Sequence, residues 1–312
     1  MRTMNWLVIA PDVKDRNLKT VEDFLEKKHN TVPYEIFIYE GMPKDELYDD
    51  IKHIMQTTHC IVVDSSLMDK LRDYIYVMGA LAGKGIRTFV YAGASYVKRY
   101  ETLDSGSRAL FHCYSSVEEL IEYVDTNFTS YESRENQKQA LIQLFTLGIP
   151  FTGDSFAEFI AKDDCEKCDI FLKAGMLVNA KTSTGVPLIC IAARNDCLSK
   201  VKWLLDNGAD IDAVSGDRGY SAVMDAVWRK NYTIVQYLVE KGANLNFIST
   251  DGQPLLVLAV GNGNEKIVDL LLRHGANAEI KDSLGMSAYE YAKLFNKPNM
   301  VKLFDKVRNK KA

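Results

Sequence analysis

The 312-residue sequence predicts an α/β domain in its N-terminal half and an all-α solenoid of repeated helix pairs in its C-terminal half. Two observations carry this prediction. Before residue 130, short apolar runs alternate with helical patterns, which is typical of an open, mostly parallel sheet covered by helices. After residue 150, a short sequence motif that contains a glycine recurs at a nearly constant interval. We therefore divide the chain into residues 1–130, a linker and connecting helix over 131–150, and a repeat region over 151–312.

The repeated phrase is clearest at Lys202–Ala213, and its glycine occurs four times, as Gly175, Gly208, Gly242 and Gly275. The intervals are 33, 34 and 33 residues. A second set of glycines keeps nearly the same period, at Gly185, Gly219, Gly252 and Gly285. A period of about 33 residues with two helical patterns indicates stacked helical repeats. One repeat cannot bury its own apolar face, so the stack is the stable object, with about five repeats and degenerate terminal ones.

Each repeat reads as an inner helix, an outer helix and a hairpin. In the second repeat, Leu188–Ala193 is an apolar helix with small residues, and Val201–Leu205 is the apolar part of the next helix. We expect Gly208 to end that helix, because a residue without Cβ takes the left-handed conformation at little cost.

These repeats resemble the ankyrin repeat family through Ala192-Ala193-Arg194-Asn195, Leu204–Asp212 and Leu271–Asn277. The resemblance covers about half of the chain, from about Phe151 to about Val307. It departs at the Thr-Pro-Leu-His box of the family, which here reads Pro187-Leu188-Ile189-Cys190, Ser221-Ala222-Val223-Met224 and Pro254-Leu255-Leu256-Val257. Because these changes remove side-chain hydrogen bonds between repeats, we expect a looser stack.

The resemblance implies a protein partner bound on the concave face of the stack. In the family this face is built from hairpin tips and from the two positions after the small pair of each inner helix. The inner-helix positions are Arg194-Asn195, Trp228-Arg229 and Gly261-Asn262, and the tips are Ser183-Thr184, Asp217-Arg218 and Thr250-Asp251. Trp and Arg often dominate binding energy. The candidate partner-binding residues are therefore Arg194, Asn195, Asp217, Arg218, Trp228, Arg229 and Asn262; the alternative for Trp228 is packing against Tyr232 or a neighbouring repeat.

The N-terminal half contains five apolar runs that predict strands, at Asn5–Ala10, Tyr34–Tyr39, Cys60–Val63, Arg87–Tyr91 and Ala109–Cys113. The segments between and after them predict helices, at Leu18–Lys28, Asp45–Thr58, Met68–Ala82, Tyr96–Thr102 and Val117–Phe128. After a polar stretch at Ser130–Lys138, Ala140–Leu147 predicts a separate amphipathic helix. In sheets of this kind, ligands bind outside the carboxyl ends of the strands.

Asp64-Ser65-Ser66, the helix with Tyr76–Ala82 and the following Lys84–Tyr91 resemble the core of the nucleoside deoxyribosyltransferase and TIR group. This resemblance covers about 120 residues and implies a flavodoxin-like sheet that binds a nucleoside or NAD. The group uses a glutamate in this helix, where the present chain has Val77 or Tyr76, and no glutamate occurs between Glu46 and Glu101. No catalytic residue is therefore assigned.

The candidate ligand-binding residues are Asp12, Asp64, Ser65 and Tyr76. The alternatives are that the two aspartates cap turns and that Tyr76 is a core or rim aromatic. Two functions follow. One is a protein-interaction module with a non-catalytic nucleotide-binding or sensing domain; the other is an NAD glycohydrolase or nucleoside ribosyltransferase targeted by its repeats. The missing glutamate favours the first.

Composition sets the remaining expectations. The net charge of −4 indicates neither a nucleic-acid nor a membrane partner, and no apolar run reaches the ~20 residues that span a bilayer. The sequence begins without a signal-peptide pattern, and its six cysteines lack a disulfide-framework spacing, so we expect a cytoplasmic protein. Cys165 and Cys168 have a metal-like interval but no second pair. No metal is expected, and a nucleotide or NAD-like molecule is the only candidate ligand.

Overall fold

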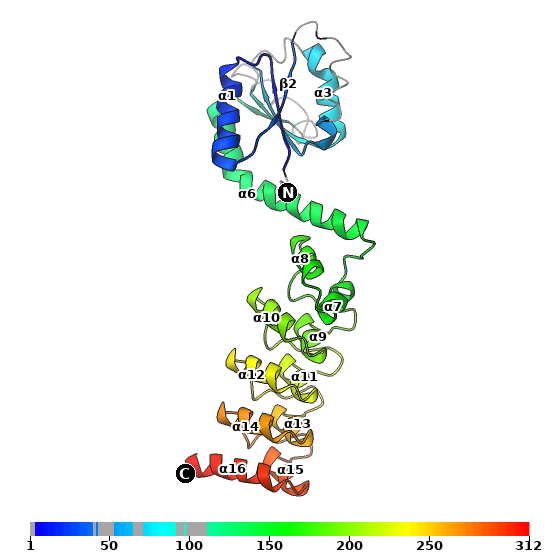
Figure 1. Ribbon diagram of the computed structural model, residues 1–312, viewed down its shortest axis with the longest axis vertical. Coiled ribbons are helices and arrows are strands. Elements are labelled where there is room, and N and C mark those ends of the chain that lie inside the picture. Colours follow the sequence, from blue (N-terminus) through cyan, green and yellow to red (C-terminus); the bar gives the residue numbers. More distant parts are fainter. Residues whose placement is uncertain are drawn as a thin grey trace. The chain divides into compact units, whose positions relative to one another are not determined.

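The computed structural model describes residues 4–39, 42, 53–64, 71–91, 97 and 111–311 (Figure 1). The chain divides into two compact units, Met1–Gln139 and Ala140–Ala312, called here the first and second unit. The first unit contains a parallel sheet with helices, and the second contains helical repeats. The predicted fold class is confirmed.

In the described part of the first unit, five parallel strands form one sheet, in the order β2-β1-β3-β4-β5. They are β1 (Trp6–Ala10), β2 (Tyr34–Phe37), β3 (His59–Val63), β4 (Arg87–Tyr91) and β5 (Phe111–Tyr114). Every residue of β1 and β3 is buried, and apart from His59 these strands are apolar on both faces. The chain runs from β1 to one neighbour, β2, and then crosses to the other, β3. The carboxyl ends of β1 and β3 therefore mark the switch point where such sheets bind ligands.

Helices cover both faces of this sheet. The helix α1 (Arg16–Asp23) continues as a π-helical segment, η1 (Phe24–Lys28), and lies with α6 (Val117–Thr146) on one face. The helix α3 (Leu71–Gly83) covers the opposite face. Trp6 and Val8 of β1 point into the first apolar layer, whereas Leu7 and Ile9 point into the second, as the alternation of a strand requires.

The structure differs from the prediction most clearly at α6. This single helix runs through the polar stretch at residues 130–138 and includes most of the segment predicted as a separate helix. The stretch contains no Gly or Pro that would end a helix. Moreover, Tyr131 and Glu135, one turn apart, are 4% and 7% exposed. The helix stops only before Gly148, which has a φ of 68°. The helices predicted at 45–58 and 96–102, and the start of the strand predicted from 109, fall largely outside the described residues.

In the second unit, described throughout residues 140–311, the helices form consecutive pairs. They are α7 (Gly153–Ala161) with α8 (Cys165–Lys173), α9 (Leu188–Arg194) with α10 (Leu198–Asp206), α11 (Ala222–Trp228) with α12 (Tyr232–Glu240), α13 (Leu255–Gly261) with α14 (Glu265–Arg273), and α15 (Ala288–Leu294) with α16 (Pro298–Lys311). Figure 1 shows the first members of these pairs following one another along one side and the second members along the other. Pro298 begins α16, where its missing N–H costs nothing.

The glycine period has the conformational cause that was expected. Gly208 ends α10 with a φ of 86°, and Gly185 in the preceding hairpin has a φ of 77°. Both values lie in the left-handed region that favours glycine. The hairpins close through single antiparallel bridges, such as the one between Lys181 and Pro187.

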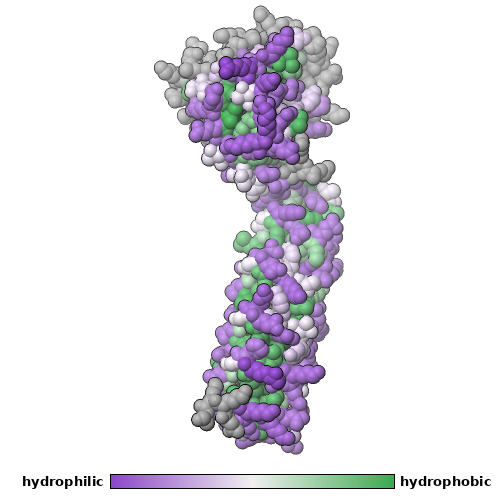
Figure 2. All heavy atoms as spheres, turned by 60° about the vertical axis from the view of Figure 1, so that its left-hand side comes forward, coloured by the Kyte–Doolittle hydropathy of each residue, from purple (hydrophilic) through white to green (hydrophobic). Residues whose placement is uncertain are grey.

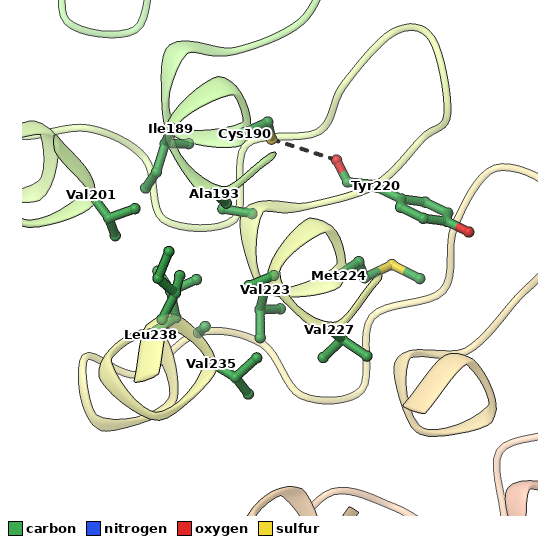
Figure 3. Packing of buried hydrophobic residues seen from close by; sticks show 14 of the residues in the cluster. Ile189, Cys190, Ala193, Val201, Tyr220, Val223, Met224, Val227, Val235 and Leu238 are labelled. Atoms are coloured by element: carbon green, nitrogen blue, oxygen red, sulfur yellow. Dashed lines mark hydrogen bonds between the residues drawn. The ribbon is translucent and has the colours of Figure 1, made fainter. Parts of the chain in front are cut away.

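Small and branched apolar side chains join neighbouring repeats (Figure 3). Ile189 and Ala193 of α9 face α11, where Val223 and Val227 are completely buried. Cys190, in the altered box, places its Sγ 3.7 Å from the carbonyl oxygen of Tyr220 in the next repeat. A weak thiol contact thus links two repeats at a position where the family has a stronger side-chain donor.

Candidate functional site

The inner helices of the second unit end in a row of equivalent positions that face solvent. We define the exposed row as Trp228, Gly261, Leu294 and Phe295, which follow the small residues of α11, α13 and α15. Trp228 is 50% exposed and Leu294 is 64% exposed, so neither belongs to the core. On the face of the second unit drawn in Figure 2, hydrophobic side chains form separate patches among hydrophilic ones. Large apolar groups left in water at equivalent positions of different repeats are typical of a contact surface.

Gly261 lies in the middle of the exposed row and leaves an open space there. A Cβ built on this residue would meet no atom within 4 Å, and its φ is not in the left-handed region. Neither packing nor backbone conformation therefore requires glycine at this position. A helical glycine costs about 1 kcal/mol relative to alanine. The effect of glycine at this position is an open space, which has Trp228 in the preceding repeat and Leu294 in the following one.

Arg229 provides an exposed cation directly after Trp228. Its Nη2 lies 3.1 Å from Oδ2 of Asp196, and the two side chains are 49% and 41% exposed. A pair this exposed contributes roughly 0–1 kcal/mol, so the guanidinium can exchange Asp196 for another carboxylate at little cost. Arg218 at the neighbouring hairpin tip is also exposed.

Arg194 has a different environment although it occupies the equivalent position in α9. Its two Nη atoms donate to Asp217 over 2.7 and 2.9 Å, as a bidentate pair. Its Nε lies 3.0 Å from Oδ1 of Asp225, which is completely buried, although that contact is not aligned as a hydrogen bond. Hydrogen bonding to Arg194 lowers the pKa of Asp217, whereas burial raises the pKa of Asp225. Arg194 and Asp217 thus fasten the hairpin tip to α9.

The two candidate asparagines also contact the backbone. Asn195 donates from Nδ2 to the carbonyl oxygen of Ile191 in its own helix, over 2.9 Å. Asn262 donates to the carbonyl oxygen of Val227 in the preceding repeat, over 2.8 Å. Asn262 is half-buried and therefore connects two repeats beside Trp228.

Sequence reasoning missed the last two residues of the exposed row. Leu294 and Phe295 follow Gly261 and Asn262 by 33 residues, so the repeat period itself could have identified them. The prediction of a degenerate last repeat drew attention away from this position. Both are large and exposed, at 64% and 46%.

The structure brings two of the four ligand candidates of the first unit to one edge of the sheet. Asp12 and Asp64 follow β1 and β3, which are neighbours at the switch point. Asp64 is 2% exposed and accepts a hydrogen bond of 2.7 Å from the hydroxyl of Tyr74. Asp12 is exposed and accepts from the backbone N–H of Lys14 over 3.0 Å. Both aspartates therefore accept hydrogen bonds within the protein, and both lie at the edge of the sheet where a ligand would bind.

The other two ligand candidates, Tyr76 and Ser65, are not placed at this edge of the sheet by the described structure. Tyr76 is 60% exposed on α3, and Ser65 lies outside the described residues. Val77, which with Tyr76 is one of the two positions where the resemblance implies a glutamate, is 1% exposed in the apolar layer under α3. Val77 therefore belongs to the core.

Among the residues that the structure describes, no helix has the length and apolarity to cross a membrane. In the same part of the chain, no three His, Cys, Asp or Glu side chains gather as metal ligands would.

Comparisons with known proteins agree with the repeat architecture. A family profile described as "Ankyrin repeats (3 copies)" matches residues 157–249 and 223–310. The chain is 36% identical over 98 residues to the B-cell lymphoma 3 protein homolog of Mus musculus, a match that covers 31% of this chain and 22% of that protein. It is 32% identical over 111 residues to an ankyrin repeat protein of fowlpox virus, covering 35% of this chain and 33% of the viral protein.

A longer match reaches beyond the repeats. An ankyrin repeat-containing protein of Treponema pallidum is 30% identical over 237 residues, which cover 75% of this chain and 78% of that protein. Because this alignment is longer than the second unit, residues 140–312, it must extend into the first unit. On this similarity over most of both proteins, the chain belongs to the family of ankyrin repeat-containing proteins.

Proposed function

We propose that the second unit binds a protein partner through the exposed row. The observation that carries this proposal is the helical Gly261, whose absent side chain leaves open space between two repeats that expose large apolar residues. An aliphatic or aromatic side chain of a partner would be buried there against Trp228 and Leu294. Truncation of a well-buried Trp in an interface typically costs 2 kcal/mol or more.

The proposed partner segment also carries a carboxylate next to its apolar anchor. Arg229 is the exposed cation beside Trp228, and its present pair with Asp196 is weak. Arg194, in contrast, is already satisfied by Asp217 and Asp225, so its contribution is to hold the hairpin tip. The proposed contact set therefore centres on Trp228, Arg229, Leu294 and Phe295, with Arg218 and Asn262 at its margin.

A random peptide library displayed on phage tests this proposal with the full chain as bait. We expect selected peptides to share an aromatic or aliphatic residue close to an Asp or Glu. The variant Gly261→Gln adds a long polar side chain at a position where a Cβ meets no atom within 4 Å, and it should bind these peptides at least about tenfold more weakly. The matched control is Glu265→Gln, on the outer helix α14. Gly208→Gln is unsuitable, because the backbone φ of 86° at Gly208 would strain any side chain there. Selection of peptides that bind Gly261→Gln equally well would contradict the proposal.

We also propose that the first unit binds a nucleotide or NAD-like ligand without cleaving it. The supporting observation is that Asp12 and Asp64 follow the two strands that meet at the switch point. The buried Val77 supports a non-catalytic role, because no carboxylate stands where the resembling enzymes carry one. An NAD glycohydrolase or nucleoside ribosyltransferase is the rival function.

Calorimetric titration with NAD and with deoxynucleosides distinguishes these two functions. We expect saturable binding of one ligand class, weakened in Asp12→Asn, and no released nicotinamide or free base after prolonged incubation. Asp154→Asn, in the second unit, is the control and should bind normally. Turnover that disappears in Asp64→Asn would instead establish the rival function.

A further inference from the structure

Two cysteines occupy the first turn of α8 in the arrangement Cys165-Glu166-Lys167-Cys168. Cys165 is the first residue of the helix after its N-cap, Asp164, and it is exposed. Cys168 lies three residues later and is completely buried. One thiol of this pair can meet a reagent from solution, and the other cannot.

A buried ammonium group lies against the exposed sulfur. Lys200, in α10 of the next repeat, has a completely buried side chain, and its Nζ donates to Sγ of Cys165 over 2.7 Å. The same Nζ lies 3.2 Å from Oδ1 of Asp163. Burial alone would lower the pKa of Lys200, but the hydrogen bonds to Cys165 and Asp163 outweigh it and raise the pKa. The lysine therefore keeps its positive charge beside the sulfur.

The two thiols differ in the groups that lie beside them. A neighbouring cation and a helix N-terminus both stabilise a thiolate, which is the nucleophile in sulfur chemistry. Cys165 has both features. Burial raises the pKa of Cys168 to about 12, so that thiol stays protonated until a partner sulfur becomes available.

Helix geometry permits a bond between the two sulfurs. Residues three apart in an α-helix have Cα atoms about 5 Å apart. Disulfides span Cα separations of about 4.4–6.8 Å. A disulfide across the first turn of α8 therefore requires rotation of two side chains and adjustment of a helix end, not a rearrangement of the repeat.

We propose that Cys165 and Cys168 form a reversible dithiol–disulfide site, in which Cys165 is the attacking thiolate and Lys200 its positioning residue. The oxidant is a low-molecular-weight disulfide. The thiolate of Cys165 attacks one sulfur of this molecule, the disulfide bond breaks, and one thiolate leaves. Cys168 then attacks the Cys165 sulfur, and its proton passes to the second thiolate as that thiolate leaves. Two protein thiols are oxidised and one disulfide molecule is reduced to two thiols.

Oxidation would act on the junction between the first two repeats. The contact between Lys200 and Cys165 joins α10 to α8, and a disulfide sulfur is a far poorer acceptor than a thiolate. Lys200 would keep Asp163, which also accepts from Ser199 over 2.6 Å. The site is remote in the repeat order from the exposed row, so this proposal does not depend on partner binding.

Equilibration of the full chain with reduced and oxidised glutathione tests the site. Acid quenching, alkylation with N-ethylmaleimide and peptide mass spectrometry then report each cysteine. We expect a Cys165–Cys168 disulfide that forms in oxidising mixtures and disappears in reducing ones. Cys168→Ser should stop the reaction at a glutathione adduct on Cys165, and Cys165→Ser should leave Cys168 unmodified. Lys200→Met should slow the first step by about tenfold.

Two controls keep the test decisive. Cys197→Ser, in the same region but without a hydrogen bond to Lys200, should leave the disulfide and its rate unchanged. If Lys200→Met fails to fold, the reaction rates of Cys165 and Cys197 with oxidised glutathione are compared in the native wild-type chain instead. Cys165 should then react at least about tenfold faster than Cys197. Equal rates at these two cysteines, or a disulfide that forms only after unfolding, would overturn the proposal.

Discussion

The two units of this protein are stabilised by contacts of very different range along the chain. In the first unit, β1 pairs with β3, so Trp6 lies opposite His59, and the core depends on segments more than fifty residues apart. In the second unit, each helix packs on its partner and on the equivalent helix of the next repeat, about 33 residues away. Contacts that repeat at a fixed interval leave a periodic pattern in the sequence, whereas contacts across a sheet do not.

The two units also differ in the ionisable groups that they bury. The second unit contains an ion pair between two repeats, in which Arg194 is mostly buried and Asp225 is completely buried. The first unit buries a histidine, His59, which stacks on Trp6 with ring centroids 4.9 Å apart. Each unit should therefore respond to a different perturbation, and three measurements sharpen this contrast.

Removal of Arg194 should have the largest effect, and it should affect the second unit. Arg194→Ala leaves Asp225 buried without a compensating charge, which typically costs about 3–5 kcal/mol of unfolding free energy. Urea denaturation followed by circular dichroism measures this cost. Arg229→Ala, which removes an exposed pair, is the matched control, and it should change stability by less than about 1 kcal/mol. Equal effects of the two substitutions would mean that Arg194 is not a structural clamp.

Acidification should act on the first unit through His59. Burial, followed by the charges of Arg87 and Lys138, lowers its pKa from 6.5 to about 4. Between these values the unfolded chain binds more protons, so stability is present above pH 6.5 and is lost as the pH falls towards 4, by up to about 3 kcal/mol. Glu22 acts in the opposite direction, because burial and its hydrogen bond to Glu35 raise its pKa from 4.5 to about 7. Its contribution is present below pH 4.5 and is lost as the pH rises to 7.

Substitutions separate these two contributions. His59→Gln should make the first unit less sensitive to acid, whereas Glu22→Gln should make it more sensitive. Trp6 is the only tryptophan before residue 140, so its fluorescence in a Trp203→Phe, Trp228→Phe background reports the first unit alone. An unchanged pH profile in His59→Gln would show that the histidine is not the group that titrates.

The sequence allowed prediction of what is local or periodic. The glycine intervals predicted the helix pairs and their left-handed ends, and the apolar runs predicted the strands. The length of α6 was not predicted, because burial of Tyr131 and Glu135 depends on tertiary packing and not on local polarity. The repeat register located Trp228 but could not show that Arg194, in the same position one repeat earlier, is held by Asp217 and Asp225 from the next hairpin and helix. Likewise, nothing local connects Asp64 with Tyr74.

The exposed row is expected to bind a partner and not to stabilise the fold, and the two tryptophans of the second unit distinguish these roles. Trp203 is half-buried and donates from Nε1 to Asp169 over 3.2 Å, whereas Trp228 is 50% exposed. The measurement is the Kd for a library-selected peptide together with the Tm, in Trp228→Ala and in Trp203→Ala. We predict that Trp228→Ala weakens binding by about 30-fold with little change in Tm, and that Trp203→Ala lowers Tm while binding below its Tm is retained. A large fall in Tm with unchanged Kd in Trp228→Ala would contradict the claim.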